Sequence, residues 1–290
     1  MAYSVNAGFN EFLTKLTPNV SESEAAKSHR QSIESVLKRN FGIINFFRSG
    51  SFGNGTSISG HSDVDYFAHI PVKKVKSNSG TMLSDVRDVL NNRFPRTGVR
   101  VNTPAVLVPF GTDVSENTEV VPAKMVSLDE DLGFIYGIAD GSGNWINSCP
   151  KAHNQYVSSV NDKLDKKLKP LIRFIKAWKY YLNVPISSFY LELFVTNYMD
   201  GDSLIWYSID IKRIIGKLYD DNLPDVRDPT GISDYISPCS SSAKKDETKT
   251  KLLTAYTRAK FAREAEEDDK NKDAFYWWDK FYGGNFTSYG

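Results

Sequence analysis

The sequence predicts an α+β fold with a mixed first half and a helical second half. Apolar residues recur at helical spacing near the N-terminus, at Phe9, Phe12 and Leu16. Residues 99–126 contain two strand-like apolar runs separated by a turn-forming segment. From Gly141 onward, long segments have the apolar spacing of amphipathic helices. These patterns predict a strand-containing lobe, residues 1–150, packed on a helical lobe, residues 151–290.

The first lobe begins with two amphipathic helices, the first of which is expected to pack across both lobes. Apolar residues at helical spacing over 33–37 indicate the second helix, and Ser21 with Glu24 fits a capping box at its start. A segment rich in Gly and Ser follows at 50–56, and a strand is expected from Asp63 to Val72. The two runs within 99–126 then predict a β-hairpin with its turn at 111–117.

The second lobe has the pattern of several helices. An apolar stripe from Leu164 to Trp178 predicts one helix, and Pro170 must either kink it or start it anew. Further segments are expected as helices at 189–199, 243–267 and 274–282, with a long proline-containing loop at 220–242.

Composition excludes several classes of protein. The 290 residues carry 36 Lys and Arg against 35 Asp and Glu, a formal net charge of +1, which argues against a globally basic nucleic-acid coat protein. Only two cysteines, Cys149 and Cys239, are present, so a disulfide framework or a Cys-rich zinc site is not expected. Neither a signal-peptide pattern nor a run of 18 apolar residues occurs, which predicts a cytoplasmic protein with no membrane partner.

Two carboxylates and a glycine-containing loop form the strongest chemical pattern. Because residues two apart on a strand share a face, Asp63 and Asp65 would lie side by side. Adjacent carboxylates repel each other unless a cation lies between them, and hard divalent cations prefer oxygen ligands. Upstream, the backbone N–H groups of Gly50 and Ser51 can approach a phosphate closely. An isolated Asp-x-Asp often marks only a solvent-facing strand, but beside this loop it predicts phosphoryl or nucleotidyl transfer.

The order Gly50-Ser51, then Ser62-Asp63-Val64-Asp65, resembles the active-site signature of the polymerase-beta-like nucleotidyltransferases. Within that superfamily the chain is most similar to the CD-NTases, the bacterial cyclic-oligonucleotide synthases of anti-phage (CBASS) signalling. The likeness extends over nearly the whole chain and includes the segments 145–150, 175–178 and 228–229. It implies a mixed sheet with helices packed on a helical C-terminal lobe, with a central cleft for nucleotides.

The resemblance also implies a metal site. Glu119 stands where the family carries its third carboxylate, although most members have Asp there; Asp113 and Glu116 are nearby alternatives. Asp63, Asp65 and Glu119 are therefore expected to be catalytic and to hold two Mg²⁺ ions, with Mn²⁺ as an alternative metal. In such a site one ion activates the attacking ribose hydroxyl and the other neutralises the pyrophosphate leaving group.

Residues 163–179 carry seven Lys or Arg side chains against one acid. A basic helix of this kind is often only a solvated face. The resemblance implies that Lys176 and Ser188, together with the amides of Gly50 and Ser51, bind the triphosphate. It also implies that Phe189 or Tyr190 stacks on the base; the alternative is that both rings belong to the core.

The implied activity is condensation of nucleoside triphosphates, ATP and/or GTP among them, into a cyclic di- or trinucleotide that reaches a downstream effector. In several CD-NTase operons an accessory protein conjugates the synthase through its C-terminal glycine, here Gly290, after the flexible-looking run 283–289. An ordinary frayed terminus is the alternative. No stable nucleic-acid duplex is expected as a partner.

Two other functions remain open at this level. The chain could transfer a nucleotide to an RNA, protein or small-molecule acceptor, or make linear oligonucleotides. It could also be a catalytically silent nucleotide-binding protein, which the intact pair of Asp63 and Asp65 disfavours. The bases used, the linkage, the ring size and the activating signal do not follow from the residues.

Overall fold

A computed structural model of the protein describes residues 3–18, 20–60, 64–110 and 116–290. The chain forms two compact units. We call the first the strand unit; it comprises the described residues of Pro18–Tyr156 and Pro229–Ser233. The second, the helical unit, comprises those of Met1–Thr17, Val157–Asp228 and Asp234–Gly290. The first helix thus shares one unit with residues 157–228 and 234–290.

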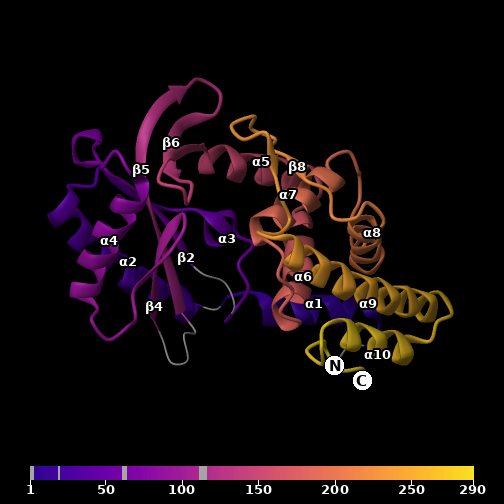
Figure 1. The fold of residues 1–290 in the computed structure, drawn as a ribbon. Coiled ribbons are helices and arrows are strands. Elements are labelled where there is room, and N and C mark those ends of the chain that lie inside the picture. The colour runs from indigo at the N-terminus through magenta and orange to yellow at the C-terminus, as the bar shows by residue number, and fades with distance from the viewer. Residues whose placement is uncertain (1–2, 19, 61–63, 111–115) are drawn as a thin grey trace. The chain divides into compact units, whose positions relative to one another are not determined.

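The strand unit is built on a mixed sheet (Figure 1). Its strands are β1 (Asn45–Arg48), β2 (Val64–His69), β3 (Arg100–Asn102), β4 (Ala105–Phe110), β5 (Glu116–Asp129), β6 (Gly133–Ala139) and β7 (Trp145–Ser148). The order β1-β2-β5-β4-β3 places β5 at the centre, and its far end pairs with β6, which pairs with β7. β2 and β5 are parallel, whereas β4 and β5 pair antiparallel. The predicted hairpin is therefore confirmed. Of its predicted turn, 111–117, residues 111–115 lie outside the described residues, and residues 116 and 117 already belong to β5.

One face of this sheet carries the main core of the unit. The helices α2 (Val20–Phe41) and α4 (Ser79–Arg93) cover it, as Figure 1 shows. Tyr66 of β2 and Val120 of β5 are fully buried there against Leu37 of α2 and Val86 of α4. Because side chains alternate across a strand, the neighbours of Tyr66 and Val120 project from the opposite face. Asp65 and Glu119 are such neighbours.

The Gly- and Ser-rich segment 50–56, which the sequence indicates as a loop, contains a short helix. Residues Gly50–Asn54 form a short helix, α3, which Gly55 ends in the left-handed region at φ +68°. The remaining elements of the strand unit are a 3₁₀ turn, Val72–Lys74, and the first half of α5 (Pro150–Lys163).

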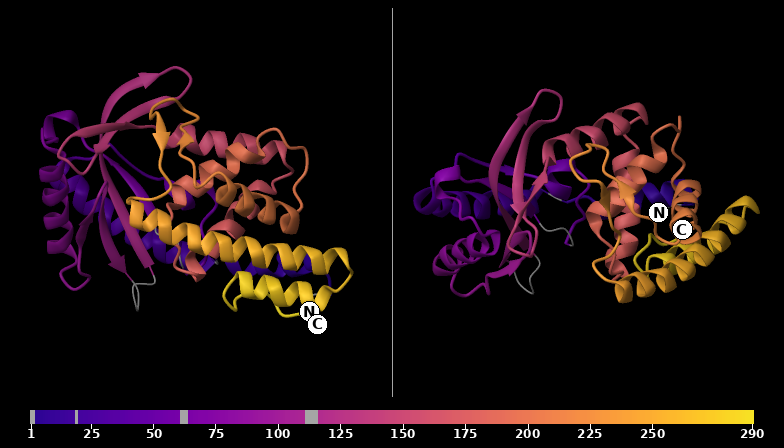
Figure 2. Two further views of the ribbon diagram at one scale, coloured as in Figure 1. Left: turned by 45° about the vertical axis from the view of Figure 1, so that its right-hand side comes forward. Right: turned by 45° about the horizontal axis from the view of Figure 1, so that its top comes forward.

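The helical unit consists of packed helices (Figure 2). They are α1 (Val5–Leu16), α6 (Leu168–Tyr181), α7 (Ser188–Met199), α8 (Tyr207–Asp220), α9 (Ser242–Glu267) and α10 (Asn271–Phe281), with the second half of α5 and the short strands β8 (Val226–Arg227) and β9 (Tyr235–Ile236). The predicted helices at 189–199 and 243–267 are confirmed within one residue. Pro170 lies in the first turn of α6, where its missing N–H costs nothing, so it starts a helix anew.

Aromatic rings fill the core of the helical unit. Phe9 and Phe12 of α1 contact Phe174 of α6, and both also lie against Phe286, with ring centroids 5.1 and 5.2 Å apart. Phe286 is only 5% exposed. The run 283–289, expected to be flexible, is therefore anchored by its aromatic side chain. Figure 2 places the two chain ends side by side, where the Tyr3 and Tyr289 rings are 5.9 Å apart.

The α+β fold class predicted from the sequence is confirmed. In the part of the chain that the structure describes, no helix combines the length and apolar character that a membrane crossing requires.

Candidate active site

The parallel pair of β2 and β5 brings two predicted carboxylates together. Asp65 of β2 and Glu119 of β5 are direct register partners, one pair along from Val64 and Thr118. Both side chains are partly exposed, whereas Val64, Thr118 and Val120 beside them are buried. Asp63 precedes Asp65 by two positions in the sequence, but it lies outside the described residues, as do Ser62 and Asp113. Two of the three expected carboxylates thus stand on neighbouring strands and face the same side.

Gly50 fits closely against the first of these carboxylates. A Cβ atom built on Gly50 would lie 1.8 Å from Asp65 Oδ2 and 2.6 Å from its Cγ, closer than any side chain allows. Gly50 also has a φ of +55°, in the left-handed region that favours glycine. The backbone N–H of Ser49 donates to the carbonyl of Asp65 at 2.9 Å, which fixes the start of α3 to β2. The absence of a Cβ atom at position 50 therefore leaves the space that the Asp65 carboxylate occupies.

Asn102 is a residue of this site that the sequence did not single out. Its Nδ2 donates to Glu119 Oε1 at 2.5 Å, from the end of β3. A donor to one oxygen of a carboxylate restricts the orientation of that carboxylate. The sequence offered no signal for Asn102, because it reaches Glu119 only through the order of strands β3, β4 and β5.

Ser51 lies within α3, one residue after Gly50, and is partly exposed. Its carbonyl accepts from the N–H of Thr56 at 2.8 Å, and this bond joins the residue after Gly55 to the first turn of α3. The structure thus keeps Gly50, Ser51, Asp65 and Glu119 in one unit, on adjoining elements.

The donors at this site fit a hard divalent cation. Two carboxylates on paired strands, one of them oriented by an amide, offer the oxygen ligands that Mg²⁺ prefers. No cluster of three or more His, Cys, Asp or Glu side chains at metal-binding range occurs among the described residues, to which Asp63 does not belong.

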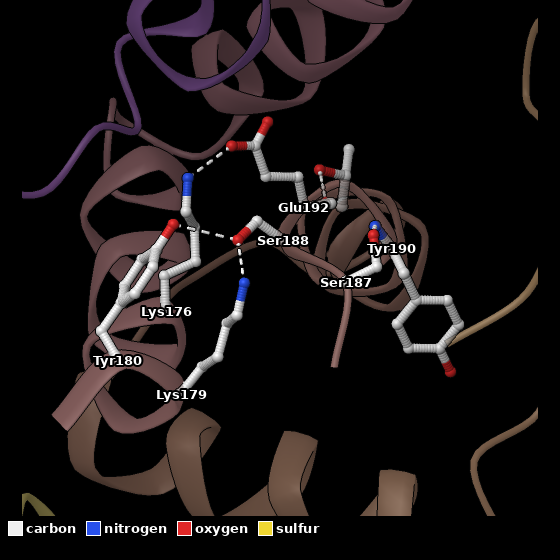
Figure 3. A network of polar contacts seen from close by, with 8 residues as sticks. Lys176, Lys179, Tyr180, Ser187, Ser188, Tyr190 and Glu192 are labelled. Atoms are coloured by element: carbon white, nitrogen blue, oxygen red, sulfur yellow. Dashed lines mark hydrogen bonds and ion pairs between the residues drawn. The ribbon is translucent and has the colours of Figure 1, made fainter. Parts of the chain in front are cut away.

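Two of the predicted phosphate ligands, Lys176 and Ser188, lie in the helical unit, where α6 and α7 meet (Figure 3). Lys176 of α6 is fully buried, and its Nζ donates to Glu192 Oε1 of α7 at 2.8 Å. Glu192 is itself 5% exposed. Burying two charges is costly unless they pair closely, so this ion pair fixes the two helices against each other. In this arrangement the ammonium of Lys176 faces a carboxylate rather than open solvent.

Ser188 meets a different lysine. Lys179, one helical turn beyond Lys176, donates from Nζ to Ser188 Oγ, and the Tyr180 hydroxyl lies 3.1 Å from the same oxygen. Figure 3 shows Lys179 and Tyr180 converging on Ser188 while Lys176 reaches to Glu192. Lys179 belongs to the basic run found in the sequence, but the sequence could not show which of two lysines three residues apart would be enclosed. The geometry favours Lys179 as the cation beside Ser188.

The two candidate base-stacking residues have opposite environments. Phe189 is 42% exposed, whereas Tyr190 is fully buried. The Tyr190 hydroxyl donates to the carbonyl of Pro224 at 2.6 Å, and burial raises the pKa of Tyr190. Tyr190 therefore belongs to the core and offers no ring face to a base, which leaves Phe189 as the candidate.

The sequence matches one protein-family model and several cyclic nucleotide synthases. Residues 3–161, more than half of the chain, match the Second Messenger Oligonucleotide or Dinucleotide Synthetase domain. The chain is 26% identical to a probable cyclic nucleotide synthase of Bacillus cereus (strain VD146), over 59% of this chain and 52% of the relative. It is 28% identical to the cyclic dipyrimidine nucleotide synthase CdnE of Cecembia lonarensis, over 64% of this chain and 74% of the relative. The alignment thus spans about half the length of the first of these relatives.

Solved structures share the fold over almost the whole chain. DncV of Vibrio cholerae, a cyclic AMP-GMP synthase solved with a linear intermediate, superposes with a TM-score of 0.78 and 16% identity, covering 99% of this chain and 97% of that one. CdnC of Escherichia coli MS115-1, solved in complex with a HORMA protein, gives 0.74 and 16%, covering 98% of both chains. The predicted nucleotidyltransferase fold is thereby confirmed. With the domain match over residues 3–161, the chain belongs to the family of second messenger oligonucleotide or dinucleotide synthetases.

Proposed function

We propose that this protein condenses nucleoside triphosphates into a cyclic di- or trinucleotide second messenger. The pairing of Asp65 with Glu119, with Gly50 against Asp65, is the observation that carries the proposal. Family membership and the cyclic nucleotide synthases among the relatives support it.

Asp65 and Glu119, with Asp63, would hold two Mg²⁺ ions, or Mn²⁺ in their place. When bound, such ions lower the pKa of an attacking ribose hydroxyl and neutralise the charge of the leaving pyrophosphate. The protein's own part is to keep the carboxylates in place. Asn102 orients Glu119 through its amide, and Gly50 leaves room for the Asp65 carboxylate.

The phosphates and the base would be held by separate groups. In the helical unit we assign phosphate contacts to Ser188 and Lys179 and the base to the exposed ring of Phe189. In the strand unit the backbone amides of Gly50 and Ser51 are the candidate phosphate donors. The buried pair of Lys176 and Glu192 is then a positioning element, which keeps α7 and its Ser188 in register with α6. Positioning and charge neutralisation are the main sources of rate in transfer of this kind.

The proposal includes a role in CBASS signalling together with an accessory protein. The E. coli CdnC solved with a HORMA protein supports a CBASS role with an accessory partner. Conjugation through Gly290 is one form that the partnership could take, and Gly290 follows a tail that is anchored through Phe286. The product, rather than the enzyme, would reach the downstream effector, in the cytoplasm.

The product of the purified protein tests this proposal. The protein is incubated with the four NTPs and Mg²⁺ without any acceptor, treated with phosphatase, and its products are identified by mass spectrometry. We expect a phosphatase-resistant species with the mass of a cyclic di- or trinucleotide. Only phosphatase-sensitive products, or products that require an added acceptor, would instead support linear synthesis or acceptor modification. Nucleotide binding without pyrophosphate release would support a silent binding protein.

A further inference from the structure

A pocket lies in the helical unit, next to the junction of α6 and α7 where Lys179 meets Ser188. Its volume is about 520 Å³, which is within the range of small-molecule sites. Three parts of the chain line it: the end of α6, the connection from α6 to α7, and the segment that leads into α9. None of these parts supplies a residue of the carboxylate pair.

The pocket is positively charged. Lys179 contributes from α6 and Lys244 from the first turn of α9, and none of its ten lining residues, all of them described, is acidic. The Lys244 Nζ donates to Ser240 Oγ at 2.9 Å, a neutral partner that leaves its charge uncompensated by that bond. Two ammonium groups from different helices, with hydroxyls between them, suit an anion better than a neutral ligand.

Apolar walls complete the pocket, and a backbone bond fixes them. Val184 and Ile186, each 2% exposed, line it together with Pro185 and Pro238. The N–H of Ser187 donates to the carbonyl of Pro238 at 2.8 Å, so the α6–α7 connection is tied to the segment before α9. The walls are therefore held at their spacing by the fold, as in preformed ligand sites.

We propose that this pocket binds a small organic dianion, a phosphate monoester or a dicarboxylate, with an apolar body. Lys179 and Lys244 would hold the anionic groups, and the Ile186 and Pro238 walls would cover the body. This site shares Lys179 with the triphosphate contacts proposed above. Its occupation is therefore measured without any NTP or Mg²⁺, so the outcome does not depend on whether the protein makes a product.

Cys239 provides a local reporter because it lines the pocket. The protein has two cysteines; Cys149 is buried, and Cys239 is partly exposed. Neutral iodoacetamide should therefore alkylate Cys239 selectively, and mass spectrometry gives the rate. We expect phenyl phosphate and isophthalate to slow this alkylation saturably, inorganic phosphate to do so at higher concentration, and benzyl alcohol to have no effect.

Matched charge variants decide where the anion binds. Lys244→Gln should weaken binding of phenyl phosphate, measured by calorimetry and by Cys239 protection, by about threefold to tenfold, a modest range because Lys244 is exposed. Lys260→Gln removes the same charge farther along α9, where Lys260 faces Glu264, and should bind as the wild type does.

Three results would overturn the proposal: no saturable protection by either dianion, equal protection by benzyl alcohol, or equal weakening in Lys244→Gln and Lys260→Gln. Equal affinity for inorganic phosphate and phenyl phosphate would refute the role of the apolar walls. Protection by only one of phenyl phosphate and isophthalate would identify the anionic group and support the site.

Discussion

Replacing Gly50 by alanine should lower the rate of product formation strongly and the free energy of unfolding only slightly. Two effects are expected. An L-residue at φ +55° costs roughly 1–2 kcal/mol of folding free energy. In addition, the new Cβ would lie 1.8 Å from Asp65 Oδ2, so the carboxylate must move by more than 1 Å to reach an ordinary contact. A misplacement of about 1 Å in a catalytic group can lower the rate by roughly 100-fold.

Gly42→Ala is the matched control. Gly42 has nearly the same conformation, φ +65°, but a Cβ there meets nothing within 4 Å. Urea unfolding should report a loss of about 1–2 kcal/mol in both variants. Phosphatase-resistant product formation should fall by about 100-fold only in Gly50→Ala. Equal product formation by the two alanine variants would refute the argument that Gly50 exists to accommodate Asp65.

Three further predictions concern single contacts. Glu192→Gln leaves the buried charge of Lys176 without its carboxylate and should lower the free energy of unfolding by about 3–5 kcal/mol in urea titrations. Asn102→Leu removes the amide that donates to Glu119 Oε1 and should lower kcat/KM by about fivefold. The free energy of unfolding should not change, because the lost hydrogen bond is exposed to solvent. Burial lowers the pKa of His69 below its ordinary value of 6.5, so below pH 6.5 the unfolded chain binds more protons than the folded chain. The free energy of unfolding should therefore decrease as the pH falls from 6.5 through the lowered pKa. This decrease should be smaller in His69→Gln.

Each of these has its own control. The double replacement of Lys176 by Met and Glu192 by Leu should recover most of the lost stability, since it removes both buried charges. Wild-type stability in Glu192→Gln would contradict the importance of the pair. Unchanged kinetics in Asn102→Leu would mean that the amide does not orient Glu119. Identical pH profiles of unfolding in the wild type and His69→Gln would exclude His69 as a source of the acid sensitivity.

The sequence predicted the chemistry of the site better than its geometry. Gly50 and Ser51, followed by Asp63 and Asp65, form a pattern that indicates nucleotidyl transfer, because this reaction needs adjacent carboxylates beside a phosphate-binding loop. Glu119 was implied only by the resemblance to the CD-NTases. The parallel register that sets Glu119 opposite Asp65 depends on the order of strands, which no local pattern encodes. Asn102 escaped notice for the same reason.

The sequence also did not show which side chains of α6 and α7 are buried. Lys176 and Lys179 look equivalent along α6, yet the first is enclosed because Glu192 of α7 faces it. Tyr190 looked as suitable for stacking as Phe189, but it lies on the inner side of α7 with its hydroxyl bonded to Pro224. Tertiary packing determines which of two neighbouring side chains on a helix is buried, and amphipathic spacing alone does not predict it.

The carboxylate pair of β2 and β5 is best tested by the initial rate at which NTPs and Mg²⁺ give phosphatase-resistant product. Asp65→Asn and Glu119→Gln should each lower this rate by at least about 100-fold while the proteins remain folded. Glu130→Gln removes an exposed acid from the turn after β5 and should keep the wild-type rate. If Asp65→Asn and Glu130→Gln made product at the same rate, the carboxylate pair could not be the catalytic centre.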